Sequence, residues 1–81
     1  MVKMLNLGRD NHYIWCDYFP ENDPQPGFIK VDLTNGEIVE KITAPYEVLL
    51  GSTMYAHHAM RKLITIQSLD PLPQITGAAW Y

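Results

Sequence analysis

Residues 27–43, GFIKVDLTNGEIVEKIT, are the clearest structural signal in the sequence and predict a β-hairpin. Two short runs rich in β-branched and apolar residues flank Asn35-Gly36. An Asn-Gly pair between such runs is the strongest short-range signal for a hairpin turn. The stretch contains no catalytic or ligand-binding motif, so it indicates an antiparallel sheet and says nothing about chemistry.

The register of this hairpin depends on its turn. A two-residue turn would place Lys30 opposite Lys41. A three-residue loop, residues 34–36, with a bulge at Gly36 would instead place Lys30 opposite Glu40. Because like charges directly opposite each other are unfavourable, we prefer the bulged register.

The segment before the hairpin favours two more strands. Residues 3–7 predict a short first strand, residues 8–11 a turn, and residues 12–19, HYIWCDYF, a second strand rich in aromatic side chains. Alternation divides the second strand into two faces, one with Tyr13, Trp15, Asp17 and Phe19, the other with His12, Ile14, Cys16 and Tyr18. Because both faces are largely apolar, we expect this strand to be central and covered on both sides. The proline-rich residues 20–26 predict a loop.

The second half of the chain predicts one helix and a closing strand. Residues 54–67 have an apolar stripe at helical spacing, formed by Ala56, Ala59, Leu63 and Ile66. Ser52 and Thr53 are both suitable N-caps, and residues 70–73, DPLP, end the helix. Residues 46–51 predict a linker or a short irregular turn, and residues 74–81 a last strand.

These elements predict an α+β fold in a single domain, residues 1–81. We expect a small antiparallel sheet of three to five strands with one helix packed on one face, in the order β-β-β-β-α-β. One helix of this length covers only one side of such a sheet.

Composition limits the functions that fit this chain. It has 81 residues, 47% of them apolar, a formal net charge of −3 and one cysteine. A small domain without disulfides or metal ligands often gains stability by oligomerising. The negative charge argues against a dedicated nucleic-acid binder. No apolar run approaches the ~20 residues that cross a bilayer, and the start does not resemble a secretory signal, so we expect a cytoplasmic protein.

Three groups of polar side chains suggest chemistry, but each has a simpler explanation. His57, His58, Arg61 and Lys62 form a basic helix face that could hold an anion or nucleic acid, although such faces are usually only solvated. Cys16 could pair with a histidine, but a cysteine within an apolar strand is usually an inert hydrophobic residue. The acidic residues Asp17, Glu21 and Asp23 lack the glycine and the spacing of a calcium loop. We therefore assign no catalytic, cofactor-binding or metal-binding residue.

We expect the aromatic residues of the second strand to form the contact surface. Tyr13, Trp15 and Phe19 could stack on bases, as in sheet-based RNA readers, but that use needs nearby lysine or arginine. The charges close to them in sequence are acidic. A core face or a dimer interface therefore fits better, and we expect an interface that includes one or more of Tyr13, Trp15, Tyr18 and Phe19.

The early aromatic strand, the hairpin GFIKVDLTNGEIVEKI, the helix sequence YAHHAMRKL and the terminal WY together resemble a group of short bacterial proteins without assigned function, of the mobile-element or prophage type. The resemblance implies no site residue. Our leading hypothesis is a small non-enzymatic protein that acts through protein–protein contact as a homodimer. The alternative is a nucleic-acid-associated accessory protein that uses the basic helix face, and the third is a small enzyme or metal binder.

Overall fold

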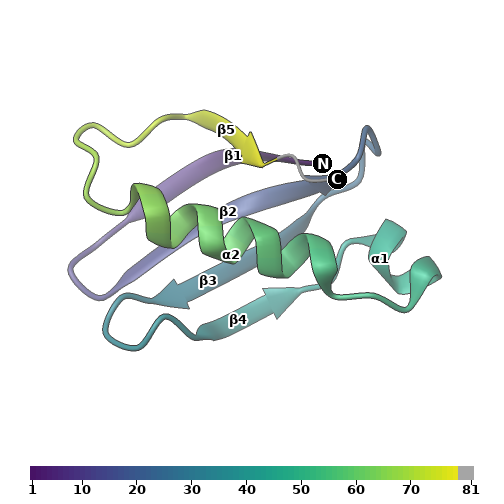
Figure 1. Ribbon diagram of the computed structural model, residues 1–81, viewed down its shortest axis with the longest axis horizontal. Coiled ribbons are helices and arrows are strands. Elements are labelled where there is room, and N and C mark those ends of the chain that lie inside the picture. Colours follow the sequence, from purple (N-terminus) through teal and green to yellow (C-terminus); the bar gives the residue numbers. More distant parts are fainter. Residues whose placement is uncertain (79–81) are drawn as a thin grey trace.

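A computed structural model describes residues 1–78 and shows a five-stranded antiparallel sheet crossed by a helix (Figure 1). The strand order is β4-β3-β2-β1-β5. The strands are β1 (Val2–Arg9), β2 (Tyr13–Pro20), β3 (Gly27–Asp32), β4 (Ile38–Ile42) and β5 (Ile75–Ala78), and the helices are α1 (Pro45–Leu50) and α2 (Met54–Ile66). The predicted α+β fold is confirmed, with the long helix before the last strand as expected. Of the expected last strand, residues 79–81 lie outside the described residues.

The β3–β4 hairpin has the predicted pairing of Lys30 with Glu40 but a different loop. The loop has four residues, 33–36, and is closed by the backbone N–H of Asp32, which donates to the carbonyl oxygen of Glu37 over 2.9 Å. Gly36 has a φ of 73°, the left-handed conformation that favours glycine. The bulge lies at Val39 rather than at Gly36, because the register shifts between Lys30 and Val31. This shift restores the expected pairing.

Strand β2 is central in the sheet, as predicted, and its side chains alternate between two environments. Ile14, Cys16, Tyr18 and Pro20 are buried on the side of α2. The side chains between them are half-buried on the opposite side. The sequence analysis predicts that both sides of β2 are covered, but only the side with Ile14, Cys16 and Tyr18 is covered, because α2 lies across one face of the sheet (Figure 1).

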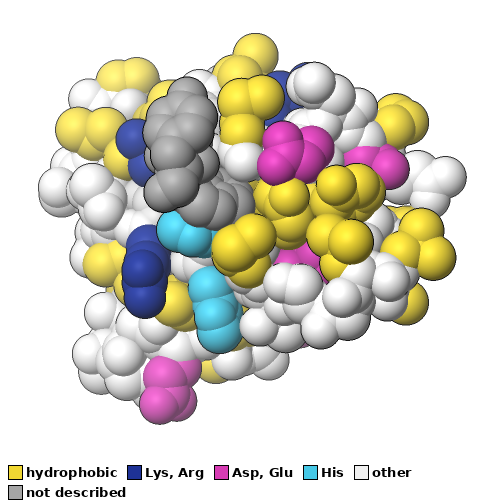
Figure 2. Space-filling model, turned by 45° about the vertical axis from the view of Figure 1, so that its right-hand side comes forward, with side chains coloured by type: hydrophobic (Ala, Val, Ile, Leu, Met, Phe, Trp, Pro, Cys, Tyr) yellow, Lys and Arg dark blue, Asp and Glu magenta, His cyan; other side chains and the backbone are white. Residues whose placement is uncertain are grey.

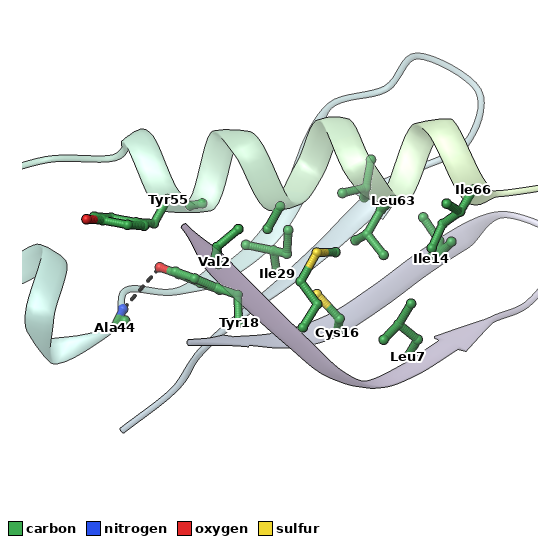
Figure 3. Close-up of a cluster of buried hydrophobic side chains, with 14 residues drawn as sticks. Val2, Leu7, Ile14, Cys16, Tyr18, Ile29, Ala44, Tyr55, Leu63 and Ile66 are labelled. Atoms are coloured by element: carbon green, nitrogen blue, oxygen red, sulfur yellow. Dashed lines mark hydrogen bonds between the residues drawn. The ribbon is translucent and has the colours of Figure 1, made fainter. Parts of the chain in front are cut away.

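The apolar stripe of α2 packs against the sheet as predicted. Ala56, Ala59, Leu63 and Ile66 are all buried, with Ala56, Ala59 and Leu63 fully inaccessible to solvent. Figure 3 shows Leu63 and Ile66 directed toward Ile14, Cys16 and Leu7 of the sheet. The small alanine side chains let the first half of the helix approach the strands closely.

Three side chains outside α2 form hydrogen bonds with backbone groups at or just beyond its ends. Thr53 is the N-cap by position but makes no side-chain capping bond. Instead, Ser52 Oγ accepts a hydrogen bond from the Met54 N–H at 3.1 Å, and Glu47 Oε2 accepts one from the Tyr55 N–H at 3.0 Å. At the other end, the guanidinium of Arg9 donates to the carbonyl oxygens of Gln67 and Leu69, where a positive charge is favourable.

The short helix α1 is not predicted by the sequence analysis, which expects a linker there. Pro45 occupies its first turn, and Gly51 ends it with a left-handed φ of 64°. Proline at the start and glycine just past the end are typical of helices. No helix among residues 1–78 combines the length and the apolar character needed to span a membrane.

Candidate interaction surface on the open face of the sheet

The face of the sheet opposite α2, here called the open face, has no helix over it among the described residues. Its central strand contributes Tyr13, Trp15, Asp17 and Phe19, all half-buried. Register places five residues side by side across the whole sheet in one row, namely Ile75, Leu5, Asp17, Phe28 and Ile42. The two ends of this row are strongly exposed, Ile75 at 68% and Ile42 at 65%. Four of the five residues in this row are apolar, and they flank the central Asp17.

Trp15 lies flat on this face because its neighbour in β1 is a glycine. Gly8 is paired with Trp15, and a Cβ atom at Gly8 would come within 2.3 Å of the indole Nε1. No real Cβ could occupy that space. Because glycine has no side chain, the indole packs directly on the backbone of β1. The ring therefore adds apolar area to the face without protruding from it.

Two lysines lie over aromatic rings of the open face. Lys30 Nζ is 4.6 Å from the ring centroid of Tyr13 and 5.7 Å from that of Trp15. Lys3 Nζ is 5.5 Å from the ring centroid of Phe19. Such contacts are favourable because the face of an aromatic ring is electronegative. Neither lysine is predicted from the sequence to lie here, because both reach the aromatic residues only through the strand register.

The open face has charges of both signs that no ion pair neutralises. Asp17 Oδ2 accepts a hydrogen bond from Asn6 Nδ2 at 2.8 Å. Lys30 is opposite Glu40 in register, yet its ammonium lies over the rings instead. The ion pair that the structure shows among residues 1–78 joins the N-terminal amine to Glu21 and lies away from this face. The open face thus combines aromatic and aliphatic side chains with charges of both signs.

Tyr18 does not belong to this surface, although the sequence analysis groups it with Tyr13, Trp15 and Phe19. It is fully buried on the α2 side. Its hydroxyl donates to Glu47 Oε1 at 2.7 Å and accepts from the Ala44 N–H at 3.1 Å, the bond drawn in Figure 3. Burial raises the pKa of this hydroxyl. The earlier assignment is corrected because alternation along β2 places Tyr18 in the core.

The four residues of the basic helix face differ in exposure. His57 and Arg61 are exposed on α2, whereas His58 and Lys62 are half-buried. Figure 2 shows histidine and Lys or Arg side chains beside a larger hydrophobic patch. Nucleic-acid binding by this face stays a prediction.

Helix α1 buries its charged residue and exposes its apolar residues, so it forms a second apolar surface. Its glutamate, Glu47, is 1% exposed, whereas Val48, Leu49 and Leu50 are 64%, 87% and 56% exposed. Met54, at the start of α2, is 42% exposed. Figure 2 turns the side of the molecule that carries α1 in Figure 1 toward the viewer, and hydrophobic side chains gather on that face. We call Val48, Leu49, Leu50 and Met54 the α1 patch.

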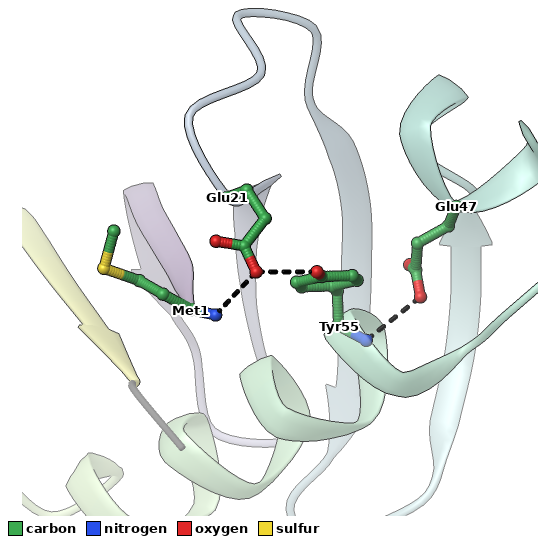
Figure 4. A network of polar contacts seen from close by, with 4 residues as sticks. All are labelled: Met1, Glu21, Glu47 and Tyr55. Atoms are coloured by element: carbon green, nitrogen blue, oxygen red, sulfur yellow. Dashed lines mark hydrogen bonds and ion pairs between the residues drawn. The ribbon is translucent and has the colours of Figure 1, made fainter. Parts of the chain in front are cut away.

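A chain of polar contacts fixes this end of the molecule (Figure 4). Both carboxyl oxygens of Glu47 accept hydrogen bonds, from the Tyr18 hydroxyl and the Tyr55 N–H. The Tyr55 hydroxyl donates to Glu21 Oε1 at 2.8 Å, and the N-terminal amine lies 3.1 Å from the same oxygen. The bond from Tyr55, followed by the amine, lowers the pKa of Glu21. These polar groups form hydrogen bonds with one another, which supports a structural role for them.

Pockets and metal clusters add no stronger candidate. One pocket is lined by residues at the start of β1, in the turn after β2 and in β5, namely Met1, Val2, Lys3, Glu21, Asn22, Thr76, Gly77 and Ala78. Its carboxylate, Glu21, already holds Tyr55 and the N-terminal amine. Within the described part of the chain, no three His, Cys, Asp or Glu side chains are placed to hold a metal ion.

Cys16 provides a direct test of the expected inert thiol. It is fully buried, and burial, with a smaller contribution from the charge of Asp17, raises the pKa of its thiol to about 12. The thiolate is the reactive species, so the folded protein should resist iodoacetamide at pH 8. Mass spectrometry measures the labelling, and we expect labelled protein only when urea is added. Rapid stoichiometric labelling without urea, at the rate of glutathione, would contradict this assignment.

Comparison with known proteins gives no relative for this chain: no family description, no curated protein and no solved structure matches it significantly.

Proposed function

We propose that the protein acts through protein–protein contact and forms a homodimer by pairing the open faces of two sheets. The observation that supports this proposal is the one-sided covering of the sheet. Strand β2 is buried under α2 on one side and presents Tyr13, Trp15 and Phe19 on the other. Large exposed apolar patches on small proteins usually mark interaction sites, and a two-fold dimer covers the same patch on both copies.

The size of the open face supports a second copy as its occupant. Five strands ~4.8 Å apart, each about six residues long at ~3.3 Å per residue, give a flat footprint of roughly 500 Å². A stable interface buries about 800 Å² of accessible surface on each partner. Protruding side chains have more accessible area than their footprint, so the whole open face approaches that size. The four residues of the α1 patch are too few to do so.

Charge balance favours protein contact over nucleic acid at this face. A stacking platform for single strands needs exposed ring faces in a positive groove. Here Lys3 and Lys30 lie on the rings, and Asp17, Asp32 and Glu40 on the same face offset their charge. A near-neutral face with both signs is suited to a copy of itself. Nucleic-acid binding therefore remains the second hypothesis, and a small enzyme or metal binder the third.

Trp15→Glu tests the proposal directly. We expect the wild-type protein to have twice the mass of the 9.3 kDa chain by light scattering at micromolar concentration. The glutamate would place an unpaired charge in the centre of an interface from which water is excluded. The variant should therefore be a folded monomer. Circular dichroism and a denaturation curve verify the fold.

Leu49→Glu is the matched control, because it makes the same kind of change on the most exposed residue of the α1 patch. It should leave the dimer intact. A wild-type protein that stays at 9.3 kDa from low to high concentration would contradict the proposal. So would a dimer that Leu49→Glu separates and Trp15→Glu does not, since that result would place the contact on α1.

A further inference from the structure

We infer that the two copies are held in register by a reciprocal pair of charges, with Asp17 of each chain meeting Lys30 of the other. This inference rests on the proposed homodimer and names the contact that would give it specificity. It starts from the positions of the charged residues on the open face, which the strand register fixes.

Asp17 occupies the centre of the open face. It lies on the middle strand, in the row between Leu5 and Phe28. The pairing of Asp17 with Phe28 makes Lys30 its diagonal neighbour on β3, and the pairing with Leu5 makes Lys3 its diagonal neighbour on β1. Diagonal neighbours in a sheet are roughly 7–8 Å apart. A negative charge is thus flanked by a positive charge on either side along one diagonal.

Symmetry restricts how two such faces can meet. In a face-to-face dimer the two-fold axis lies within the interface, and a residue on that axis contacts its own copy. An axis through Asp17 would place two carboxylates together in an apolar contact, which is strongly unfavourable. Moving the axis by half the diagonal, roughly 4 Å, brings Asp17 onto the partner's Lys30. The same operation brings Lys30 onto the partner's Asp17, so two identical ion pairs form.

Lys30 is the better partner of the two lysines. It is half-buried and its ammonium lies over two rings, those of Tyr13 and Trp15, whereas Lys3 is exposed and lies over one ring, that of Phe19. An ammonium already positioned over aromatic rings loses less conformational freedom when a carboxylate approaches it. An ion pair enclosed by those rings is also poorly screened by salt.

Charge reversal tests this contact with three variants. Asp17→Lys places a lysine opposite the partner's Lys30 at both contacts, and Lys30→Asp places an aspartate opposite the partner's Asp17, so each variant alone should self-associate at least about tenfold more weakly than the wild type. Mixing the two variants should restore a heterodimer, because each contact then joins opposite charges. The double variant Asp17→Lys/Lys30→Asp should again form a homodimer. Masses come from light scattering and heterodimers from native mass spectrometry.

Lys3→Asp is the matched control, because it reverses the other lysine beside Asp17 and should weaken association less than Lys30→Asp. Variants that dimerise as well as the wild type, or single variants that fail to pair when mixed although both are folded by circular dichroism, would overturn the inference. A monomeric wild type would instead overturn the proposed homodimer, so the two failures differ.

Discussion

Leu63→Ala is expected to lower the free energy of unfolding by about 2–5 kcal/mol, the usual cost of removing a buried leucine side chain. Leu63 is fully inaccessible to solvent in the middle of the α2 stripe and points at the sheet (Figure 3). Its removal loses apolar burial and leaves a cavity between two rigid layers, which relax only in part. A chain of 81 residues has little stability to lose, so a shift this large should be plain in urea denaturation.

Arg61→Ala is the matched control on the same helix, since Arg61 is exposed and its change should stay within about 0.5 kcal/mol. All variants should be compared at one protein concentration, because dimerisation makes apparent stability depend on concentration. An equal denaturation midpoint for Leu63→Ala and wild type would mean that the stripe does not form the core.

The helix stripe and the hairpin could be predicted because their signals are local. The spacing of four apolar residues determines which side of α2 is buried, and every member of the stripe is buried. Asn35-Gly36 indicated the turn, and charge pairing selected the register of Lys30 with Glu40. The loop itself was predicted one residue too short. A bulge at Val39 compensates for the extra residue, and no local pattern indicates where a bulge lies.

The open face could be predicted only in part. Alternation along β2 correctly groups Tyr13, Trp15 and Phe19 on one side. The same alternation places Tyr18 on the opposite side, so its predicted place at the contact surface is wrong. The contacts of Lys30 with the aromatic rings depend on how β2 pairs with β3 across a proline-rich loop, and the sequence does not specify that register.

Helix α1 was missed because its polarity pattern is inverted. A run of Val48, Leu49 and Leu50 after a glutamate suggests buried aliphatic residues and an exposed acid, whereas the structure has the reverse. Pro45 and Gly51 did mark the two ends of a helix. The burial of Glu47 depends on donors from β2 and α2, which only the assembled fold brings together.

Glu47→Ala is therefore expected to be strongly destabilising although it removes an acidic side chain from an acidic protein. Two donors, the Tyr18 hydroxyl and the Tyr55 N–H, would be left buried without their acceptors. Each buried donor without a partner costs about 1–3 kcal/mol. The measurement is urea denaturation, together with hydrogen exchange at the Tyr55 amide, which should lose protection because its acceptor is gone.

Glu37→Ala is the control for loss of an exposed acidic residue, and it should change stability little. Tyr18→Phe removes one of the two donors, so Glu47→Ala should cost less in that background than in the wild type. Such coupling is expected only for residues in direct contact. Additive effects of the two substitutions, or an unchanged Tyr55 amide in Glu47→Ala, would show that Glu47 does not hold α1 against α2. If Glu47 does hold it, the carboxyl group turned inward is what keeps Val48, Leu49 and Leu50 directed outward.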